Sequence, residues 1–171
     1  MATEIERKFL VKSSAWREEV DHCRWMRQGY LTDFRQAERA SVRIRWSDGQ
    51  GELNIKSLEL GVSRQEYAYS VPGEEAQEML DTLCTGPLIE KRRHYIFRDG
   101  LTWEIDEFFG DNEGLVVAEV ELQRADQKIP MPSWLGPEAT HRERYYNVAL
   151  ARRPFREWNE QERAGRDLGV D

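Results

Sequence analysis

The sequence has few of the side chains that hold zinc or form disulfides: two cysteines and three histidines among 171 residues. Cys23 and Cys84 lie far apart and belong to no paired cysteine spacing. Zinc folds and disulfide-stabilised secreted domains both depend on closely and regularly spaced Cys or His residues. We therefore expect neither class, and we interpret the two cysteines as ordinary thiols.

Long apolar runs are also absent from the sequence. The longest runs are far too short to span a bilayer, and the N-terminus has no hydrophobic segment of the signal-peptide type. We therefore expect a cytoplasmic protein with no membrane partner. The hydrophobic fraction of 39%, with six Trp, six Tyr and six Phe, is enough to bury the core of one compact domain.

The chain has no excess of positive charge, because its formal net charge is −7 and its isoelectric point is near 5.2. A nucleic-acid-binding protein needs a basic face for its phosphate contacts, so we expect no nucleic-acid partner. A small polyanion is not excluded, because its binding depends on the local field in a cleft. The placement of the Arg and Lys residues therefore matters more than their number.

Several common catalytic motifs are missing. Ser41 and Ser63 have no G-x-S-x-G context, and no glycine-rich phosphate loop of the P-loop kind occurs. His94 falls on the opposite face of its predicted strand from Lys91 and Arg93. A single histidine in that position is more typical of packing than of catalysis.

Alternation of apolar and charged residues with a period of two recurs along the chain and predicts β-strands. In "ASVRIRWS", Arg43 and Arg45 lie on one face and Ile44 on the other. Short turn signals such as "SDGQGE" and "RDG" separate such segments, which favours antiparallel neighbours. The predicted strands cover residues 4–10, 40–47, 51–60, 63–71, 89–97, 101–108 and 115–123.

Helical patterns are fewer. Residues 71–86 have acidic residues in the first turn and apolar residues at helical spacing, and Gly86 followed by Pro87 is expected to end this helix. Residues 13–23 and 141–151 are two further predicted helices. We expect one domain over residues 1–153, followed by a polar tail over 154–171 that is either a fraying helix or a loose end.

Charges of the same sign repeat two residues apart on several predicted strands. A solvated sheet face explains the charges of any one strand, but like charges so close repel each other. Carboxylate rows suit a hard divalent cation, and Arg and Lys rows suit phosphate. The pattern therefore predicts a combined metal and phosphate site. Its pairs are Arg43 with Arg45, Lys91 with Arg93, Glu104 with Asp106, and Glu119 with Glu121.

The first predicted strand, "EIERKFL" at residues 4–10, places Glu4, Glu6 and Lys8 on one face and fits an E-x-E-x-K signature. With this signature the chain resembles the triphosphate tunnel metalloenzymes, also called the CYTH superfamily, and most of all their short bacterial single-domain branch. The resemblance extends to about residue 153. It continues through "RQGYL", "VRIR", "LNIK", "SRQEYAY", "GPLIEKRR", "WEIDEF", "LVVAEVEL" and "RYYNVALA".

The resemblance implies an α+β, mainly β fold: a closed, eight-stranded antiparallel β-barrel with a few flanking helices and a hydrophilic tunnel inside. Glu4, Glu6 and Lys8 would then point into the tunnel. The Tyr145–Tyr146 pair is expected to pack against the barrel, with closure of one tunnel mouth as the alternative.

The resemblance also implies the residues of the site. Mg²⁺ or Mn²⁺ would be held by Glu4, Glu6, Asp106, Glu119 and Glu121. The phosphates would be bound by Lys8, Arg43, Arg45, Lys56, Arg64, Lys91 and Arg93, with Glu66 and Glu104 as supporting residues. The expected catalytic residues are Glu6, Lys8, Lys91 and Glu121.

Three functions stay open at this point. The first is metal-dependent hydrolysis of a triphosphate, with inorganic tripolyphosphate ahead of nucleoside or thiamine triphosphate. The second is an adenylyl cyclase of the class IV type within the same superfamily. The third is a non-catalytic binder of polyphosphate or nucleotide. The sequence does not decide among them, because rows of arginines bind one phosphate chain much like another, and it leaves open whether the chain forms a homodimer.

Overall fold

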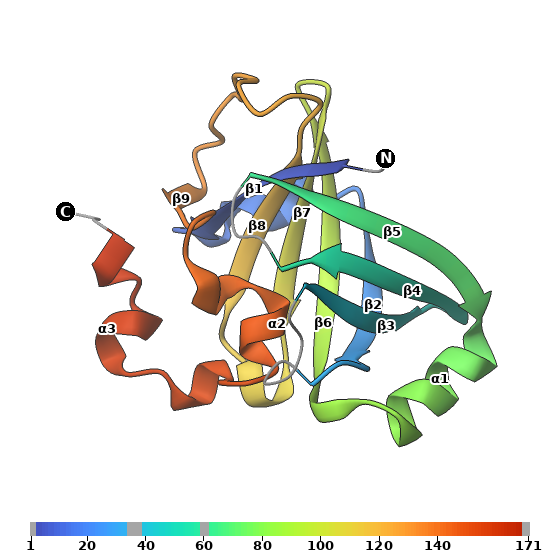
Figure 1. The fold of residues 1–171 in the computed structure, drawn as a ribbon. Helices are drawn as coiled ribbons and strands as arrows, with labels where there is room; N and C mark the ends of the chain where they lie inside the picture. The colour runs from blue at the N-terminus through green and yellow to red at the C-terminus, as the bar shows by residue number, and fades with distance from the viewer. Residues whose placement is uncertain (1–2, 34–38, 59–61, 169–171) are drawn as a thin grey trace.

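The structure is a computed structural model that describes residues 3–33, 39–58 and 62–168, so residues 59 and 60 of one predicted strand lie outside it. Strands dominate the chain, as predicted (Figure 1). They are β1 (Thr3–Val11), β2 (His22–Tyr30), β3 (Ala40–Ser47), β4 (Gln50–Ser57), β5 (Ser63–Pro72), β6 (Thr85–Arg98), β7 (Leu101–Phe108), β8 (Val116–Glu121) and β9 (Leu135–Glu138).

Eight of these strands close into an antiparallel barrel. Their order is β5-β4-β3-β2-β6-β7-β8-β1, and pairing between β1 and β5 joins the two ends of the sheet. The prediction of a closed eight-stranded antiparallel barrel is therefore confirmed. The short strand β9 pairs with β1 outside this ring and was not predicted.

Alternation along the strands places the apolar side chains mainly on the outside of the barrel, where other elements cover them. Helix α1 (Gly73–Thr82) packs Ala76 and Leu80 against Ile44 of β3. On another side, Trp16 and Trp134 cover the outer faces of β1, β7 and β8. Because the apolar faces point outward in this way, the charged faces of the strands are left to line the interior.

The helix α1 confirms the predicted helix over residues 71–86 but is shorter. It ends at Thr82, and Gly86 and Pro87, expected to stop the helix, lie in strand β6. Gly86 has a φ of +77°, which glycine adopts without strain. It lies where the pairing of β6 with β2 changes register. A glycine at this position lets the backbone adopt the conformation that the register shift requires.

The other predicted helices are also shorter than expected. Residues 13–23 form a 3₁₀ helix, η1 (Ser14–Glu19), and then enter β2. Residues 141–151 contain a 3₁₀ turn, η3 (Glu143–Tyr145), and one turn of α-helix, α2 (Asn147–Leu150). Further short pieces are η2 (Gly110–Asn112), η4 (Phe155–Glu157), α3 (Glu160–Arg163) and η5 (Arg166–Leu168).

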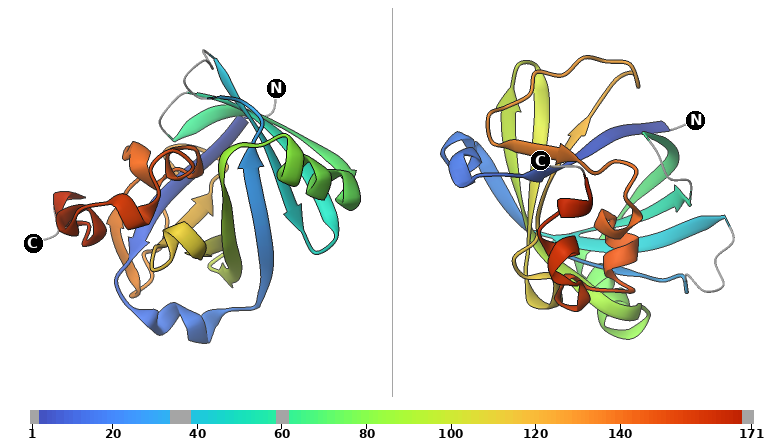
Figure 2. Two further views of the ribbon diagram at one scale, coloured as in Figure 1. Left: turned by 90° about the horizontal axis from the view of Figure 1, so that it is seen from below. Right: turned by 90° about the vertical axis from the view of Figure 1, so that its left-hand side faces the viewer.

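The C-terminal tail packs on the barrel, so the expectation of a loose end is wrong for residues 155–168. Trp158 is buried and packs edge-on against Tyr145 at 5.1 Å between ring centroids. The same cluster contains Ile89, Phe108 and Val117, which occupy inward positions at one end of the barrel. Figure 2 shows this segment and α1 on opposite sides of the barrel. Within the described ranges, no helix is long and apolar enough to cross a membrane.

Candidate functional site

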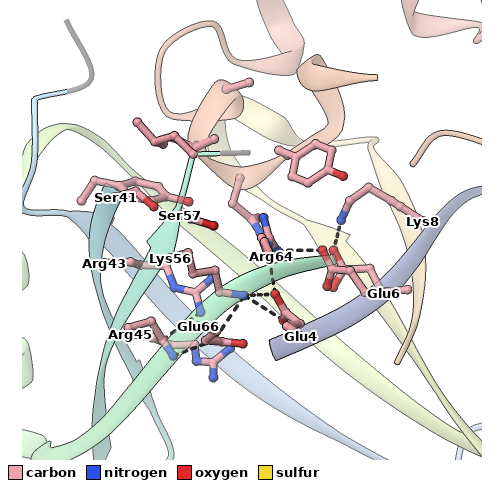
Figure 3. Close-up of a pocket in the computed structure, with 18 of the residues that line it drawn as sticks. Glu4, Glu6, Lys8, Ser41, Arg43, Arg45, Lys56, Ser57, Arg64 and Glu66 are labelled. Atoms are coloured by element: carbon pink, nitrogen blue, oxygen red, sulfur yellow. Dashed lines mark hydrogen bonds and ion pairs between the residues drawn. The ribbon is translucent and has the colours of Figure 1, made fainter. Parts of the chain in front are cut away.

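The interior of the barrel contains a cavity of about 500 Å³ with mainly charged walls (Figure 3). Most of the side chains that the sequence placed in the site line this cavity, although they come from seven different strands. They are Glu4, Glu6, Lys8, Arg43, Arg45, Lys56, Arg64, Glu66, Arg93, Glu104, Glu119 and Glu121.

Strands β1 and β8 form the acidic wall of the cavity. Their register places Glu6 opposite Glu121 and Lys8 opposite Glu119. Burial and the neighbouring Glu119 carboxylate raise the pKa of Glu6, and burial together with Glu4 raises the pKa of Glu121. Carboxylates with raised pKa values lack enough positive charge close by, so this wall has room for a cation.

The adjoining wall, formed by β5 and β4, is basic and is tied to the acidic wall by ion pairs. Lys56 of β4 donates to both oxygens of Glu4 at 2.8 Å. Arg64 of β5 bonds Glu4 at 2.8 Å and Glu6 at 2.7 Å. Although burial opposes it, the charges of Lys56 and Arg64 lower the pKa of Glu4 to about 2. Lys56 and Arg64 thus keep Glu4 ionised and join the two walls.

Arg43 and Arg45 of β3 extend the basic wall, and Figure 3 shows them across the cavity from Glu4 and Glu6. Arg45 forms an ion pair with Glu52. Arg43 donates instead to the amide oxygen of Asn54 at 2.8 Å, and its Nε is buried without a hydrogen-bond partner. Arg43 therefore keeps donor capacity that a bound anion can use.

Lys91 and Asp106 do not line the cavity, although the sequence predicted both as site residues. They form a fully buried ion pair at 2.6 Å, and Arg93 bonds Asp106 through Nε and Nη2 at 2.7 Å. Arg93 also reaches Glu119 at 2.8 Å. Burial and the charge of Arg93 lower the pKa of Lys91 to about 7. The pair thus supports Arg93, which does line the cavity.

The C-terminal segment contributes to the cavity wall, which the sequence suggested only as the alternative role of the Tyr145–Tyr146 pair. Tyr146 is buried there, with its ring centroid 5.0 Å from Nζ of Lys8 and 5.4 Å from Cζ of Arg64. Of the Tyr pair, Tyr145 packs on Trp158 as predicted, whereas Tyr146 faces the cavity. Further lining residues from this segment are Glu143, Asn147, Val148, Ala149 and Arg152. No alternation marks this segment, and the only signal was the "RYYNVALA" match.

The side chains present fit a hard divalent cation. Glu6, Glu119 and Glu121 come from two paired strands and offer oxygen ligands, which Mg²⁺ and Mn²⁺ prefer. The raised pKa values of Glu6 and Glu121 are the expected result of carboxylates crowded together. Within the described part of the chain, no three His, Cys, Asp or Glu side chains are close enough together to hold a metal ion as they stand. Instead Glu6 and Glu119 are held by Arg64, Lys8 and Arg93.

The chain is similar in sequence to proteins of one family. The family model of the CYTH domain matches residues 2–154. An inorganic triphosphatase of Acetivibrio thermocellus is 41% identical over 160 residues, which cover 94% of this chain and 100% of that protein. An inorganic triphosphatase of Nitrosomonas europaea is 38% identical over 152 residues, covering 87% of this chain and 97% of that protein.

A solved structure has a similar fold. The crystal structure of an inorganic triphosphatase superposes with a TM-score of 0.61 at 34% sequence identity. The match covers 88% of this chain and 95% of the solved chain.

Proposed function

The chain belongs to the CYTH domain family, and from this premise we propose that it hydrolyses the phosphoanhydride bond of a triphosphate held inside the barrel. Inorganic tripolyphosphate is the proposed substrate. Two relatives of nearly full length bear the name inorganic triphosphatase, which supports this choice.

The single observation that carries the proposal is the pairing of the two charged walls inside a closed barrel. Lys56 and Arg64 both bind Glu4, and Arg64 also binds Glu6. Unpaired charges in such an interior are costly, and here the charges of each wall neutralise those of the other. A triphosphate with a divalent cation can replace these pairs on both sides at once, since the anion suits the bases and the cation suits the carboxylates.

We assign the cation to the acidic wall, at Glu6, Glu119 and Glu121, with Glu4 beside them, and we propose Mg²⁺ or Mn²⁺. When bound there, it would neutralise phosphate charge and lower the pKa of a coordinated water. Asp106 is a second-best ligand, because its oxygens are already bonded to Lys91 and Arg93.

The chain's own residues then bind and orient the substrate. Arg43, Arg45 and Lys56 bind the non-bridging oxygens, and Arg64, Lys8 and Arg93 are released toward the phosphates as the carboxylates exchange partners. Phosphoryl transfer depends mainly on positioning and on neutralising developing charge, which a row of fixed bases supplies. Water attacks the terminal phosphorus, the P–O bond to the bridging oxygen breaks, and orthophosphate and pyrophosphate leave. Lys91 acts indirectly, by fixing Asp106 and through it Arg93.

A phosphate-release screen tests the proposal. The wild-type protein is incubated with tripolyphosphate, ATP or thiamine triphosphate, each with Mg²⁺, with Mn²⁺ and with EDTA. We expect orthophosphate from tripolyphosphate in the presence of a metal and none in EDTA.

Analysis of the products in the same screen distinguishes the proposed hydrolase from the two alternative functions. Cyclic AMP and pyrophosphate from ATP would identify a cyclase and overturn the proposal. Tight tripolyphosphate binding without turnover under either metal would identify a binding protein instead.

A further inference from the structure

One side chain of the cavity has no assigned role: Arg152, which follows the helix α2. It lines the same cavity as the strand residues, and its side chain is exposed. Its guanidinium makes no ion pair or hydrogen bond to any residue in the described ranges. An arginine that faces a cavity without a partner is a candidate anion ligand.

The adjacent arginine shows that this lack of a partner is particular to Arg152. Arg153 bonds the carboxylate of Glu162 through two nitrogens, at 2.9 and 2.7 Å, and does not line the cavity. The other basic residues of the cavity wall are also paired with carboxylates, except for Arg43, which donates to the amide oxygen of Asn54 and hydrogen-bonds Tyr30.

These two arginines lie at the same end of the barrel. The carbonyl oxygen of Ala151 lies 3.4 Å from where a Cβ on Gly86 would be, so the segment before Arg152 rests on the start of β6. There Thr85 pairs with Tyr30 of β2, and Tyr30 in turn pairs with Arg43 of β3. Arg45 lies farther along β3 and also borders a second cavity toward the opposite end.

The cavity is therefore polarised from one side to the other. The side next to β3 has Arg43 with a buried, unsatisfied Nε, the exposed Arg152, and the hydroxyls of Ser41 and Ser57. Figure 3 shows Ser41, Ser57 and Arg43 together, on the other side of the cavity from Glu6 and Lys8, with the C-terminal segment as a pale orange ribbon nearby. The carboxylates proposed to hold the cation are on that other side.

We propose that Arg152, together with Arg43, binds the terminal phosphate of the substrate that is farthest from the acidic wall, and that Arg152 thereby selects inorganic triphosphates. This inference rests on the proposed function and adds its specificity. A free terminal phosphate carries close to two negative charges at neutral pH. An esterified phosphate carries only one and has a bulky substituent, so an additional arginine favours the free end over the nucleoside-bearing end of ATP.

The test compares Arg152→Ala with Arg152→Lys, and uses Arg153→Ala as the matched control on the adjacent residue. Steady-state kinetics with tripolyphosphate and with ATP are measured for each protein. Tripolyphosphate binding is also measured by calorimetry in EDTA, so that one readout does not depend on turnover. Thermal unfolding checks that each variant remains folded.

We expect Arg152→Ala to raise KM and Kd for tripolyphosphate by about tenfold to a hundredfold, the range for lost charge-assisted hydrogen bonds. KM for ATP should change by less than about threefold, Arg152→Lys should recover part of the loss, and Arg153→Ala should match the wild type. Equal losses for both substrates, or Arg152→Ala binding tripolyphosphate like Arg153→Ala, would overturn the inference. A wild type that binds tripolyphosphate without hydrolysing it would refute only the proposed hydrolase, and the binding comparison would still decide the role of Arg152.

Discussion

Glu6 on β1 lies directly opposite Glu121 on β8, so that two carboxylates form one cross-strand pair facing the lumen. Like charges directly opposite each other destabilise a sheet. Burial raises the pKa of both groups, and Glu119 adds to the shift at Glu6 as Glu4 does at Glu121. The pair therefore lowers the stability of the cation-free barrel while it prepares a ligand set for a divalent ion.

Replacing either member of this pair should abolish metal-dependent turnover without unfolding the barrel. We expect Glu6→Gln and Glu121→Gln each to lower kcat by at least about a hundredfold, as removal of one electrostatic contact in a preorganised site does. Phosphate release is measured over a range of Mg²⁺ and Mn²⁺ concentrations. The exposed Glu113, which does not line the cavity, gives the control variant Glu113→Gln. Full activity in either lumen variant would refute the metal assignment.

Asp106 should be needed for folding. Its carboxylate is fully buried and bonded to Lys91 and Arg93. Asp106→Asn would leave those two cations without their partner, which we expect to cost about 3 to 5 kcal/mol of the free energy of unfolding. Urea denaturation measures this loss, and the double variant with Lys91→Met should recover part of it. A single variant as stable as the wild type would show that the buried pair is dispensable.

The ion pairs of Glu4 should make stability depend on pH in a defined window. Its pKa is lowered from 4.5 to about 2, although burial opposes the shift, by Lys56 and Arg64. A lowered pKa in the folded state stabilises the fold above pH 4.5, and this contribution is lost as the pH falls toward 2. The difference in unfolding free energy between wild type and Glu4→Gln should therefore be constant near pH 6 and shrink below pH 4.5. A difference that grows on acidification would contradict this assignment.

Tyr146 should act through its ring. The ring contacts the cations of Lys8 and Arg64, and its hydroxyl donates to the carbonyl of Thr140 at 2.6 Å. We expect Tyr146→Leu to lower kcat/KM by about threefold to thirtyfold, which corresponds to the loss of partly desolvated cation–π contacts. Tyr146→Phe keeps the ring and should retain most activity while it loses some thermal stability. Equal activity of the two variants in the kinetic assay would argue against a role for the ring.

The sequence predicted well which face of its strand each charged residue occupies. It predicted less well where along the barrel axis the residue lies. Period-two alternation assigned Arg43, Lys56 and Glu119 to the interior, because parity along a strand determines which face a side chain occupies. Parity does not say how far along the barrel axis a residue lies. Lys91 and Asp106 are therefore on the predicted face, yet they lie beneath the cavity wall and outside its lining.

Two parts of the structure could not be derived from local patterns. Strand β9 has the sequence "LGPE", which is too short to show alternation and contains Pro137. The C-terminal segment forms short turns whose position depends on contacts such as Trp158 with Tyr145. The position of Arg152 at the cavity thus results from tertiary packing. Secondary-structure propensity does not predict that position.

Among the described residues, the β1–β5 junction that completes the ring has three paired positions, whereas β3 and β4 share eight. It joins segments about sixty positions apart in the chain, so forming it costs more conformational entropy than any hairpin. Because so few positions pair there, we expect this seam to fray before the strands of the ring that pair over longer stretches. One of these paired positions joins Glu4 to Arg64, whose side chains also form an ion pair. In the proposed function this ion pair exchanges partners when the substrate binds, so substrate exchange is coupled to transient loosening of the seam.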